Sequence, residues 1–545
     1  MIRAEIKKLI DNSIKALQKE KTLPDFDIPE INIEHPENEE FGDYSSNVAM
    51  VTAKLARMKP MDLAEKLKVK IENLKPSDLL EKVEVVKPGF VNLILDKRYF
   101  LGQIPGILKK KKKYGDLEIG KGQKIQVEFI SANPTGPLTI GNGRGGFTGD
   151  VLVSVLNKAG YFAFREYYWN DAKDSTQVEG LGKSVKGEEE VYAGEYIKDL
   201  PNKIKKEFNK NVDDLSIEEA GQYAVSILKK DIEKFIKEKL NINFDNWFSE
   251  QSLYDNTKKD KALKLMEEEK LLYEKEKAKW FKSSEYGDTE DRVVIRSDGS
   301  PTYLLPDIAY HLDKFDRGFD KVINIWGADH GGYVARLKGA MEALGHKGKL
   351  EILIAQLVRL IKNGQEVKMS KRAGTFVTLE ELIDEVGLDA SRFFFLMYSL
   401  NTHMDFDMDL AKEKSDKNPV YYVQYAHARM SSIFLKAEAE GIKNISMDTK
   451  EHDPNLLSNQ AELALIKELI KYPELIEDVA TRYEIHRLPY YSIDLARKFH
   501  SFYNACQVIN DDSELTKSRL ALVRASQIVL QNVLGVMGVS APEHM

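Results

Sequence analysis

The stretch KIQVEFISANPTGPLTIGNGRGGFTGD, residues 124–150, decides the fold. Its first part, IQVEFI, is a short apolar and β-branched run that predicts a strand. A loop rich in Gly, Pro and Asn follows, and an apolar helical pattern then runs from Phe147 to Leu156. A strand, a glycine-rich turn and a helix in this order favour an α/β architecture.

Further strands of the same sheet are predicted from short apolar runs along the chain. They are FAFREYYW (162–169), RVVIRS (292–297), KVINIWG (321–327) and LEILIAQLVRL (350–360). Between the first two runs, residues 178–290 are rich in Lys and Glu and indicate a charged helical insertion. We therefore predict a parallel sheet that is covered on both faces.

The two ends of the chain have residue patterns that differ from those of the central part. A helix is predicted near the N-terminus from the stripe of Ile2, Ile6, Leu9, Ile10, Ile14 and Leu17. EVVKPGFVNLIL (84–95) predicts a hairpin, and lysines 109–113 indicate a linker that ends near Gly122. A solvated helix end and a phosphate-facing patch are alternatives for that lysine run. Residues 415–545 predict helices only. The chain thus divides into an N-terminal α+β module (1–115), a central α/β domain (116–410) and a C-terminal all-α helical bundle (411–545).

Composition limits the class of protein. The chain has 545 residues, a formal charge of −7 and 42% hydrophobic residues, enough for several cores. No apolar run approaches the ~20 residues that span a bilayer, and the N-terminus lacks the pattern of a signal peptide. Cys506 is the only cysteine, so neither an internal disulfide nor a cysteine-ligated zinc site can form. We expect a cytoplasmic protein with no membrane partner and no structural zinc.

The glycine-rich turn combines an accessible backbone with the start of a helix. Its glycines lie at positions 136, 141, 143, 145 and 146. Glycine permits positive φ and lets a bulky group approach closely, while the N–H groups at a helix start attract anions. The spacing does not fit GxGxxG in this context and lacks GxxxxGK[ST]. A phosphate-binding loop and a purely structural tight turn both remain open.

A second segment, KNGQEVKMSKRAGTFVTLEEL (362–382), carries cations between two turn signals. The cations are Lys362, Lys368, Lys371 and Arg372. Positive side chains on a loop suit a polyphosphate that gains charge in a transition state. A solvated basic loop is the alternative.

Together the two segments resemble the paired motifs of class I aminoacyl-tRNA synthetases, HIGH and KMSKS. Here they read TIGN (139–142) and KMSKR (368–372). The flanking blocks are similar to arginyl-tRNA synthetases: VEFISANPTGPLTIGNGRG, FREYYWNDA, SDGSPTYLLPDIAYHLDK, WGADHGGYVARLKGA, NPVYYVQYAHAR and GVMGVSAPEHM. The resemblance runs from EEFGDYSSNVAM to the last residue.

The resemblance implies a Rossmann-like catalytic domain and an arginine–tRNA ligase. ATP and L-arginine would give arginyl-adenylate and pyrophosphate, and the arginyl group would then pass to the 3′-terminal adenosine of tRNA(Arg). The attacking carboxylate is already ionised, so catalysis rests on positioning and charge stabilisation. Mg²⁺ would arrive with ATP, held largely by phosphate oxygens and water. The family generally binds tRNA before it activates arginine.

Carried over residue by residue, the resemblance implies the nucleotide site. The expected catalytic residues are Thr139, Gly141, Asn142, Lys368 and Lys371. Lys371 would clamp the departing phosphates, and Gly141 would lie under the adenine. The other expected ATP contacts are Ala132, Pro134, Thr135, Gly136, Pro137, Leu138, Ile140, Gly143, Gly327, His330, Met369, Ser370 and Arg372. A hydrogen-bonded structural role is the alternative for His330.

The substrate side chain is a planar cation with five donors, which needs carboxylates and carbonyl oxygens. The expected arginine contacts are Glu128, Ser131, Asn133, Tyr303, Asp307 and Asp329. Tyr303 and Asp307 are four residues apart and share a face if the segment is helical. A surface charge or a helix cap is the alternative role for each lone acid.

For the tRNA, the resemblance implies an anticodon-binding C-terminal domain and an N-terminal module that contacts the tRNA elbow. The expected contacts are Tyr44, Ser46, Asn47, Tyr421, Tyr422, Gln424, Tyr425 and Arg429. Aromatic faces and donors suit unstacked bases, although a place in the core is the alternative for about half of the tyrosines. With a net charge of −7, tRNA affinity is expected to come from a localised basic stripe.

The chain departs from the pattern at both histidines of HIGH, which are Thr139 and Asn142 here. Each is a hydrogen-bond donor without a positive charge. We predict an active enzyme, because a neutral donor can still contact phosphate, and we expect a monomer. The alternative is a tRNA-binding paralogue with weakened or lost catalysis.

Overall fold

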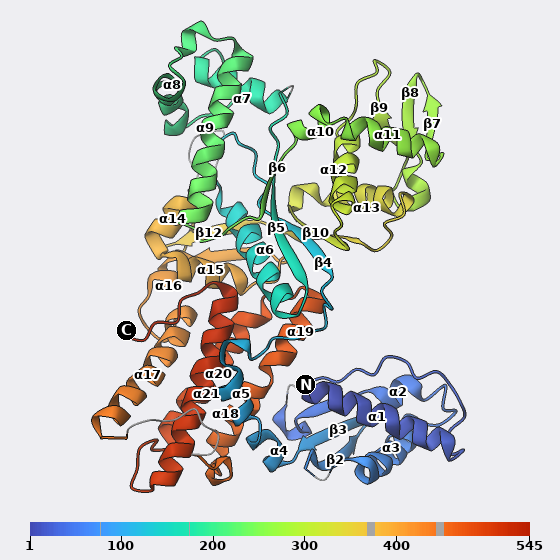
Figure 1. Ribbon diagram of the computed structural model, residues 1–545, viewed down its shortest axis with the longest axis vertical. Helices are drawn as coiled ribbons and strands as arrows, with labels where there is room; N and C mark the ends of the chain where they lie inside the picture. Colours follow the sequence, from blue (N-terminus) through green and yellow to red (C-terminus); the bar gives the residue numbers. More distant parts are fainter. Residues whose placement is uncertain (37, 77, 174, 368–376, 443–451) are drawn as a thin grey trace.

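The computed structural model describes residues 1–545 with the exception of 37, 77, 174, 368–376 and 443–451. Figure 1 shows an N-terminal module, a central region built on a parallel sheet, and a bundle of helices at the C-terminus. This arrangement confirms the predicted fold class: a parallel-sheet α/β domain with an α+β module before it and a helical bundle after it.

The N-terminal module is a three-stranded antiparallel sheet, with strand order β1-β3-β2, covered by helices. Its elements are α1 (Ile2–Lys19), η1 (Glu39–Phe41), β1 (Tyr44–Ser46), α2 (Val48–Thr52), α3 (Pro60–Leu74), β2 (Leu80–Val86) and β3 (Phe90–Leu95). The whole predicted apolar stripe of α1 is buried, and β2 and β3 pair as the predicted hairpin.

The segment predicted as a linker is helical and packed. It consists of α4 (Lys97–Leu101), α5 (Ile104–Lys110) and the short η2 (Lys111–Lys113). Helix α5 packs against the C-terminal helix α21 (Ser513–Met537) and buries Ile107 and Leu108, whereas lysines 109–113 are exposed. The lysine run therefore forms an exposed helix end.

Five parallel strands form the central sheet in the order β11-β10-β4-β5-β6. Their bounds are β4 (Lys124–Glu128), β5 (Phe162–Trp169), β6 (Asn246–Ser249), β10 (Lys321–Gly327) and β11 (Leu350–Ala355). Helix α6 (Ile140–Lys158) connects β4 to β5 and packs on β4, β5 and β10. Gly149 of α6 lies so close to the Phe129 ring that a β-carbon there would overlap it. The helix thus needs glycine in order to lie on the sheet.

Three predictions about strands are wrong in detail. Residues 178–290 are not purely helical, because they contribute β6 to the edge of the central sheet. RVVIRS contains β9 (Arg292–Ile295), which pairs antiparallel with β8 in a separate sheet of order β7-β8-β9. LEILIAQLVRL divides into β11 and β12 (Val358–Lys362), and β12 lies in a third sheet. A short β-branched run favours a strand, but its partner is set by contacts far away in sequence.

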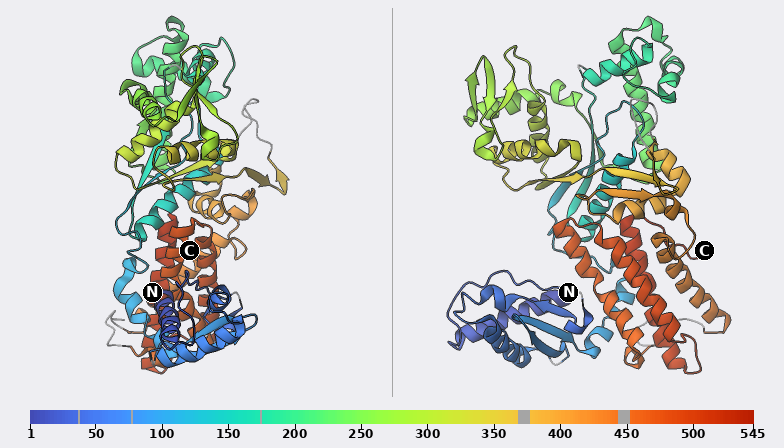
Figure 2. Two further views of the ribbon diagram at one scale, coloured as in Figure 1. Left: turned by 90° about the vertical axis from the view of Figure 1, so that its right-hand side faces the viewer. Right: turned by 180° about the vertical axis from the view of Figure 1, so that it is seen from behind.

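Two projections rise from the central sheet on opposite sides (Figures 1 and 2). One holds α7 (Thr176–Lys186), α8 (Glu195–Phe208), η3 (Val212–Asp214) and α9 (Ile217–Glu238). The other holds α10 (Gln251–Asp255), α11 (Lys258–Glu268), β7 (Leu272–Lys275), β8 (Ala278–Phe281), η4 (Ser283–Tyr286), β9, α12 (Leu304–Asp316), η5 (Ala328–Tyr333) and α13 (Val334–Ala343). The elements between the central sheet and the bundle in sequence are β12, β13 (Gln365–Glu366), α14 (Leu379–Val386), α15 (Leu388–Leu396), β14 (Met404–Asp407) and α16 (Met408–Lys412).

After residue 412 the described chain is helical throughout, as predicted. The bundle comprises α17 (Pro419–Ala439), η6 (Pro454–Leu456), α18 (Gln460–Ile470), α19 (Tyr472–Arg482), α20 (Arg487–Ala505) and α21. Helix α21 is long and apolar enough to cross a membrane, but 78% of its apolar window is buried inside the protein. This burial is what the core helix of a bundle requires.

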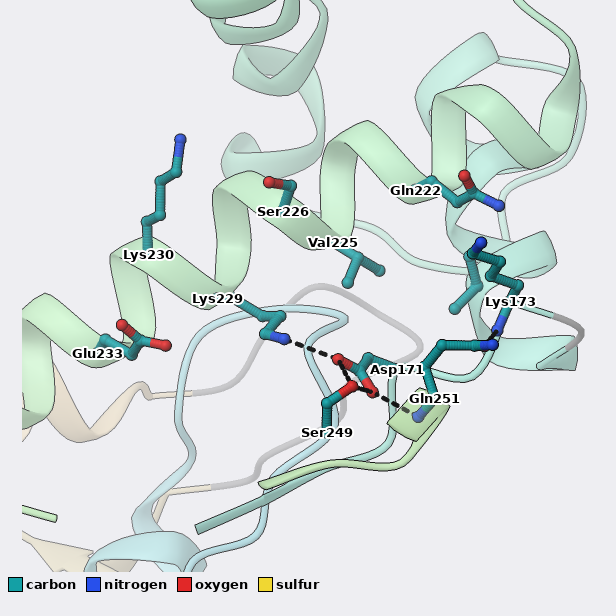
Figure 3. A pocket seen from close by; sticks show the side chains of 11 residues that line it. Asp171, Lys173, Gln222, Val225, Ser226, Lys229, Lys230, Glu233, Ser249 and Gln251 are labelled. Carbon is teal, nitrogen blue, oxygen red and sulfur yellow. Dashed lines mark hydrogen bonds and ion pairs between the residues drawn. The ribbon is translucent and has the colours of Figure 1, made fainter. Parts of the chain in front are cut away.

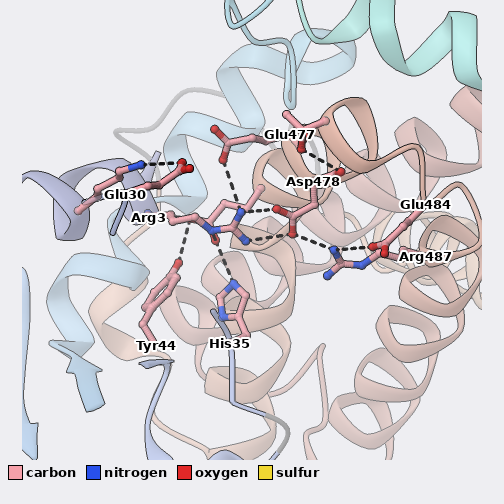
Figure 4. Close-up of polar contacts among 11 residues, drawn as sticks. Arg3, Glu30, His35, Tyr44, Glu477, Asp478, Glu484 and Arg487 are labelled. Carbon is pink, nitrogen blue, oxygen red and sulfur yellow. Dashed lines mark hydrogen bonds and ion pairs between the residues drawn. The ribbon is translucent and has the colours of Figure 1, made fainter. Parts of the chain in front are cut away.

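Charged side chains join the N-terminal module to the bundle (Figure 4). Arg3 on α1 binds Asp478 on α19 through two hydrogen bonds, of 2.5 and 3.1 Å, and Arg487 donates to the same carboxylate at 3.1 Å. Tyr44 and His35 both contact Glu474, at 3.1 and 3.0 Å. The module is therefore held against α19 by buried and half-buried polar contacts.

Candidate active site

The candidate site lies at the carboxyl ends of the parallel strands. The strand order β11-β10-β4-β5-β6 reverses direction between β4 and β10, and ligands of open α/β sheets bind at such a switch point. Glu128 ends β4 there and Gly327 ends β10, while the glycine-rich turn leads from β4 into α6. The segment that decided the fold therefore also forms one wall of the site.

Four hydrogen bonds fix the loop between β4 and α6, and they come from β5, the loop after it and α8. They run from Tyr167 Oη to Ala132 O (2.9 Å), from Tyr168 N to Ser131 Oγ (3.2 Å), from Asn170 Nδ2 to Asn133 Oδ1 (2.5 Å) and from Tyr196 Oη to Thr135 O (2.9 Å). Ile130 and Ser131 adopt positive φ, 67° and 36°. A loop held this tightly presents its backbone in one conformation.

The two residues that replace the histidines of HIGH contact each other. Thr139 is the N-cap of α6, and its backbone N and its Oγ1 both lie 2.9 Å from Asn142 Oδ1. This contact leaves the amide NH₂ of Asn142 for another partner at the positive end of the helix. The pair therefore both caps the helix and presents a neutral donor.

The glycines of the turn have different roles. Gly141 is exposed, and a β-carbon there would meet only Thr139 Oγ1, at 3.8 Å. Gly143 is buried, and a β-carbon there would lie 2.7 Å from Leu379 Cδ1. Gly141 thus leaves open space above the backbone, as a flat base needs, whereas Gly143 serves packing. Of the other expected ATP contacts, Pro134, Leu138 and Ile140 have buried side chains, and 132, 135, 136 and 137 are partly exposed.

The expected residues Lys368, Met369, Ser370, Lys371 and Arg372 lie outside the described residues. Both flanks of this segment are placed. Val367 N donates to Leu360 O at one end, and Leu379 N donates to Leu138 O at the other, both at 2.9 Å. Thr378 also forms a β-bridge with Thr139. Thr378 and Leu379, which follow these residues in the sequence, therefore lie directly beside the glycine-rich turn.

Three carboxylates lie near one another beside this turn. Glu128 is buried at the end of β4, Asp307 lies in the first turn of α12, and Glu250 directly follows β6. Burial and the negative charges of Asp307 and Asp171 raise the pKa of Glu250 to about 7. Burial also raises the pKa of Asp307 to about 6, an effect that the Tyr333 hydroxyl beside it opposes and the Glu128 charge reinforces. Raised pKa values of this kind are typical of buried carboxyl groups that have no positively charged partner in the free protein.

Other expected arginine contacts are more exposed. Tyr303 is the N-cap of α12, one helical turn before Asp307, and is 74% exposed. The side chain of Asp329 is 80% exposed and lies 3.6 Å from His330, whose side chain is 62% exposed. Ser131 and Asn133 lie in the fixed loop. The structure thus brings Glu128 and Asp307 together and leaves Tyr303 and Asp329 at the rim.

Sequence reasoning missed Glu250 and Tyr333. Glu250 lay inside the segment read as a helical insertion, and the signal that could have found it is the run NWFS before it, which forms β6. A residue that follows a strand of a parallel sheet lies at the ligand-binding edge. Tyr333 ends η5 after β10, and nothing in its immediate sequence connects it to Asp307.

A cavity of about 440 Å³ lies between the sheet edge and the projection formed by α7–α9 (Figure 3). Lys229 of α9 donates to Asp171 at 2.7 Å, and Ser249 at the end of β6 donates to the same carboxylate at 2.8 Å. Lys173 and Lys230 also line the cavity. These contacts attach the projection to the sheet beside Glu250.

The expected tRNA contacts on α17 lie on one partly exposed surface. The Arg429 guanidinium lies between the rings of Tyr425 and Tyr503, 5.4 and 5.2 Å from their centroids. Tyr421 stacks on Tyr425 at 6.4 Å, and Tyr422 lies 5.0 Å from His500. Gln424 differs, because its amide donates to Asp389 at 2.8 Å and to the Ser540 backbone at 3.1 Å, which joins the bundle to α15.

In the N-terminal module, two of the three expected contacts are buried. Tyr44 is fully buried and donates to Glu474, and Ser46 donates to Asn32 O at 2.8 Å. Asn47 is partly exposed. The Tyr44 and Ser46 side chains therefore hold the module together and against the bundle in this structure.

Among the residues that the structure describes, no group of three or more His, Cys, Asp or Glu side chains could hold a metal ion.

The fold and the site define a class I aminoacyl-tRNA synthetase. The family model described as tRNA synthetases class I (R), catalytic domain, matches residues 103–394. A model of the arginyl tRNA synthetase N terminal domain matches residues 4–95, and a DALR anticodon binding domain model matches residues 423–545. A class I synthetase uses ATP to activate its amino acid.

The chain belongs to the arginyl-tRNA synthetase family, whose members are arginine–tRNA ligases. Its similar relatives include the arginine–tRNA ligases of Syntrophotalea carbinolica, 42% identical over 558 residues, and Bacillus velezensis, 45% identical over 568 residues. In both cases the match covers 100% of this chain and 100% of the relative. The predicted family is confirmed.

Two solved structures share the fold. The arginyl-tRNA synthetase of Thermus thermophilus has a TM-score of 0.79 and 22% identity, with 100% of both chains covered. That of Plasmodium falciparum has a TM-score of 0.78 and 20% identity, with 99% of both chains covered. These likenesses extend over all three regions of the chain.

Proposed function

We propose that this chain activates L-arginine and passes it to tRNA(Arg) at the carboxyl edge of the central sheet, with the guanidinium held by Asp307, Glu250 and Glu128. One observation carries the proposal. Within the described part of the chain, neither Asp307 nor Glu250 makes an ion pair, yet both lie in an environment that penalises their charge. A planar cation from outside would supply the missing partner for these acids.

The nucleotide would lie beside this acidic group. We place ATP over Gly141, with its phosphates between the N-terminal turn of α6 and the cations Lys368 and Lys371. The open space above Gly141 and the bridge between Thr139 and Thr378 support this placement. The NH₂ of Asn142 would contact a phosphate in place of a histidine. Mg²⁺ would enter with ATP, bound by phosphate oxygens rather than by a protein cage.

The pH dependence of arginine recognition tests this proposal. Asp307 and Glu250 have pKa values raised to about 6 and about 7, and each must be ionised in order to pair with the guanidinium. The arginine KM is therefore expected to rise roughly 20-fold as the pH falls from about 8 to about 6, since each group loses its charge below its pKa. ATP–pyrophosphate exchange with tRNA present, over a series of arginine concentrations, measures it.

Glu250→Gln is the matched control for the pH profile. It removes the carboxyl with the higher pKa, so the rise near pH 7 should disappear while a smaller rise near pH 6 persists. An arginine KM that stays constant from pH 8 to pH 6 in the unsubstituted enzyme would exclude these acids from the substrate site.

The helical bundle would read the anticodon through the surface around Tyr425 and Arg429, where a guanidinium and aromatic faces are already assembled. We propose that the module of residues 1–115 contacts the tRNA elbow, that 116–410 is the catalytic domain and that 411–545 is the anticodon-binding domain. The boundaries of the matched families support this division. We also propose that the enzyme is a cytoplasmic monomer without structural zinc.

Salt dependence tests the tRNA contacts. The net charge of −7 requires a localised cationic surface, so tRNA affinity should fall about 10³-fold between ~50 and ~200 mM salt if about six phosphates are contacted. Filter binding or fluorescence titration measures it. Arg429→Gln should weaken binding, whereas Tyr44→Phe should leave the Kd unchanged because the Tyr44 hydroxyl is buried against Glu474. A flat salt response would contradict the proposed surface.

A further inference from the structure

A buried chain of hydrogen bonds connects the first turn of α12 to the end of β4. It runs from Asp307 O to His311 Nδ1 (2.7 Å), from His311 Nε2 to Asn324 Nδ2 (2.7 Å), from Asn324 Oδ1 to Lys314 Nζ (3.0 Å) and from Lys314 Nζ to Glu128 Oε2 (2.5 Å). His311, Lys314, Asn324 and Glu128 are each at most 5% exposed. This series of hydrogen bonds begins at Asp307 and ends at Glu128, and both residues belong to the proposed arginine site.

The direction of each hydrogen bond in this series follows from the chemistry of the neighbouring group. The Asp307 carbonyl can only accept, so His311 Nδ1 carries the proton and Nε2 accepts from the Asn324 amide. The amide oxygen of Asn324 must then accept from Lys314. Burial and the nearby Lys314 charge lower the pKa of His311 well below its usual value, which keeps the ring neutral as this order requires.

Lys314 supplies the positive charge in this series of hydrogen bonds. Its side chain is fully buried, and its ammonium donates to both Asn324 and Glu128 and lies 4.2 Å from the Tyr310 ring centroid. Burial lowers the pKa of Lys314, an effect that the charge of Glu128 opposes first and that of Glu166 second. The charged and titratable groups around it are Glu128 on β4, Glu166 on β5, and Asp307, Tyr310, His311 and Arg317 on α12 or directly after it.

The consequence concerns the carboxylate of Glu128. Lys314 occupies Oε2, and among the described residues Oε1 makes no hydrogen bond, so it is left for a ligand. A carboxylate that is held through one oxygen presents the other oxygen in a defined direction. A planar guanidinium has donors in fixed positions, so it binds best to an acceptor that is oriented in this way. The same chain ties this carboxylate to the helix turn that carries Asp307.

We propose that Lys314 is a positioning residue for arginine recognition: it fixes the Glu128 carboxylate and, through Asn324 and His311, its placement relative to Asp307. This inference rests on the proposed arginine-binding role of Glu128 and Asp307. Lys314 would not contact the substrate directly. Its effect is to orient one acceptor and hold it at a set place relative to a second.

Lys314→Met tests the proposal. The arginine KM and Kd should rise about 10- to 100-fold, as happens when the outer hydrogen-bond partner of a metal ligand is removed. The KM for ATP should stay within about threefold. A purely structural role would lower thermal stability and move neither readout selectively.

Arg317→Met is the matched control. Arg317 lies just after α12 and makes a bidentate ion pair with the buried Glu166, at 2.5 and 2.8 Å, outside the chain that ends at Glu128. It should lower stability while the arginine KM stays within about threefold. An equal rise of the arginine KM in both variants would overturn the proposal, as would an unchanged arginine KM in Lys314→Met.

Glu128→Gln and the double variant E128Q/K314M complete the test. Glu128→Gln should itself raise the arginine KM, and an unchanged KM there would refute the proposed arginine site rather than the role of Lys314. The double variant buries no lone charge, so it can fold even where Lys314→Met does not. It should bind arginine at least about fivefold more weakly than Glu128→Gln alone, since the amide introduced at position 128 would then lack its support. Equal affinities would overturn the proposal.

Discussion

Replacing Asp307 with Asn should lower kcat/KM for arginine by about 10²–10³-fold, while the KM for ATP stays within about threefold. Asp307 lies where burial raises its pKa to about 6, and in the described structure it has no cationic partner of its own. Loss of one partner from a desolvated charge pair has an effect of this size. The amide keeps the shape and removes the charge, so the loss reports on the guanidinium. Steady-state aminoacylation and ATP–pyrophosphate exchange measure it.

Asp329→Asn is the matched control for this substitution. Its side chain is 80% exposed, so solvent screens any interaction with substrate, and kcat/KM for arginine should change by less than about threefold. If Asp329→Asn had the larger effect, the guanidinium would lie at the rim of the site. If neither substitution altered arginine use, the acidic group would not be the substrate pocket.

Arg144→Met should destabilise the catalytic region by about 3–5 kcal/mol, because several buried carbonyls would lose their donor, and should abolish most of the activity. Arg144 is 1% exposed, and burial lowers its pKa to about 10, which leaves it charged at neutral pH. Its guanidinium donates to four carbonyls, those of Gln356 (3.0 Å), Leu357 (3.4 Å), Ser399 (2.7 Å) and Thr402 (2.7 Å). Methionine would leave all four without this partner.

The expected loss of activity follows from where those carbonyls lie. Gln356 and Leu357 connect β11 to β12, and β12 leads through β13 toward the part of the sequence that holds Lys368 and Lys371. Arg359→Met is the control, because Arg359 pairs with Asp405 at the surface, with side chains 56% and 48% exposed, and should cost less than about 1 kcal/mol. Thermal unfolding and circular dichroism separate the two variants. Equal stabilities would show that the four carbonyls find other partners.

The sequence predicted a large part of the fold because its local patterns were strong. The stripe of α1, the hairpin of β2 and β3, and the strand–turn–helix unit at 124–158 each follow from periodicity and turn residues within one segment. The run RVVIRS was assigned to the wrong sheet, since β-propensity indicates a strand but does not name its partner. The four-residue β6, within a charged segment, gave too short a signal to be found.

For the proposed arginine site, the sequence predicted the glycine-rich turn, Glu128 and Asp307, and the structure adds Glu250, Tyr333 and Lys314 as candidates. Each added residue reaches the site from a segment far from the turn in the sequence. Tyr44 shows the reverse case, because a polar aromatic residue in a recognisable string is fully buried against Glu474, 430 positions away. Burial and charge partners decide such roles.

By itself the sequence determined the class of protein, the parallel sheet and the chemistry of the turn, because residues adjacent in the chain encode these features. Only the tertiary structure decided which acids lie near one another, which of them pairs with the buried Lys314, and which glycine faces open space. These properties depend on desolvation and on distances between segments that meet only after the sheet has formed.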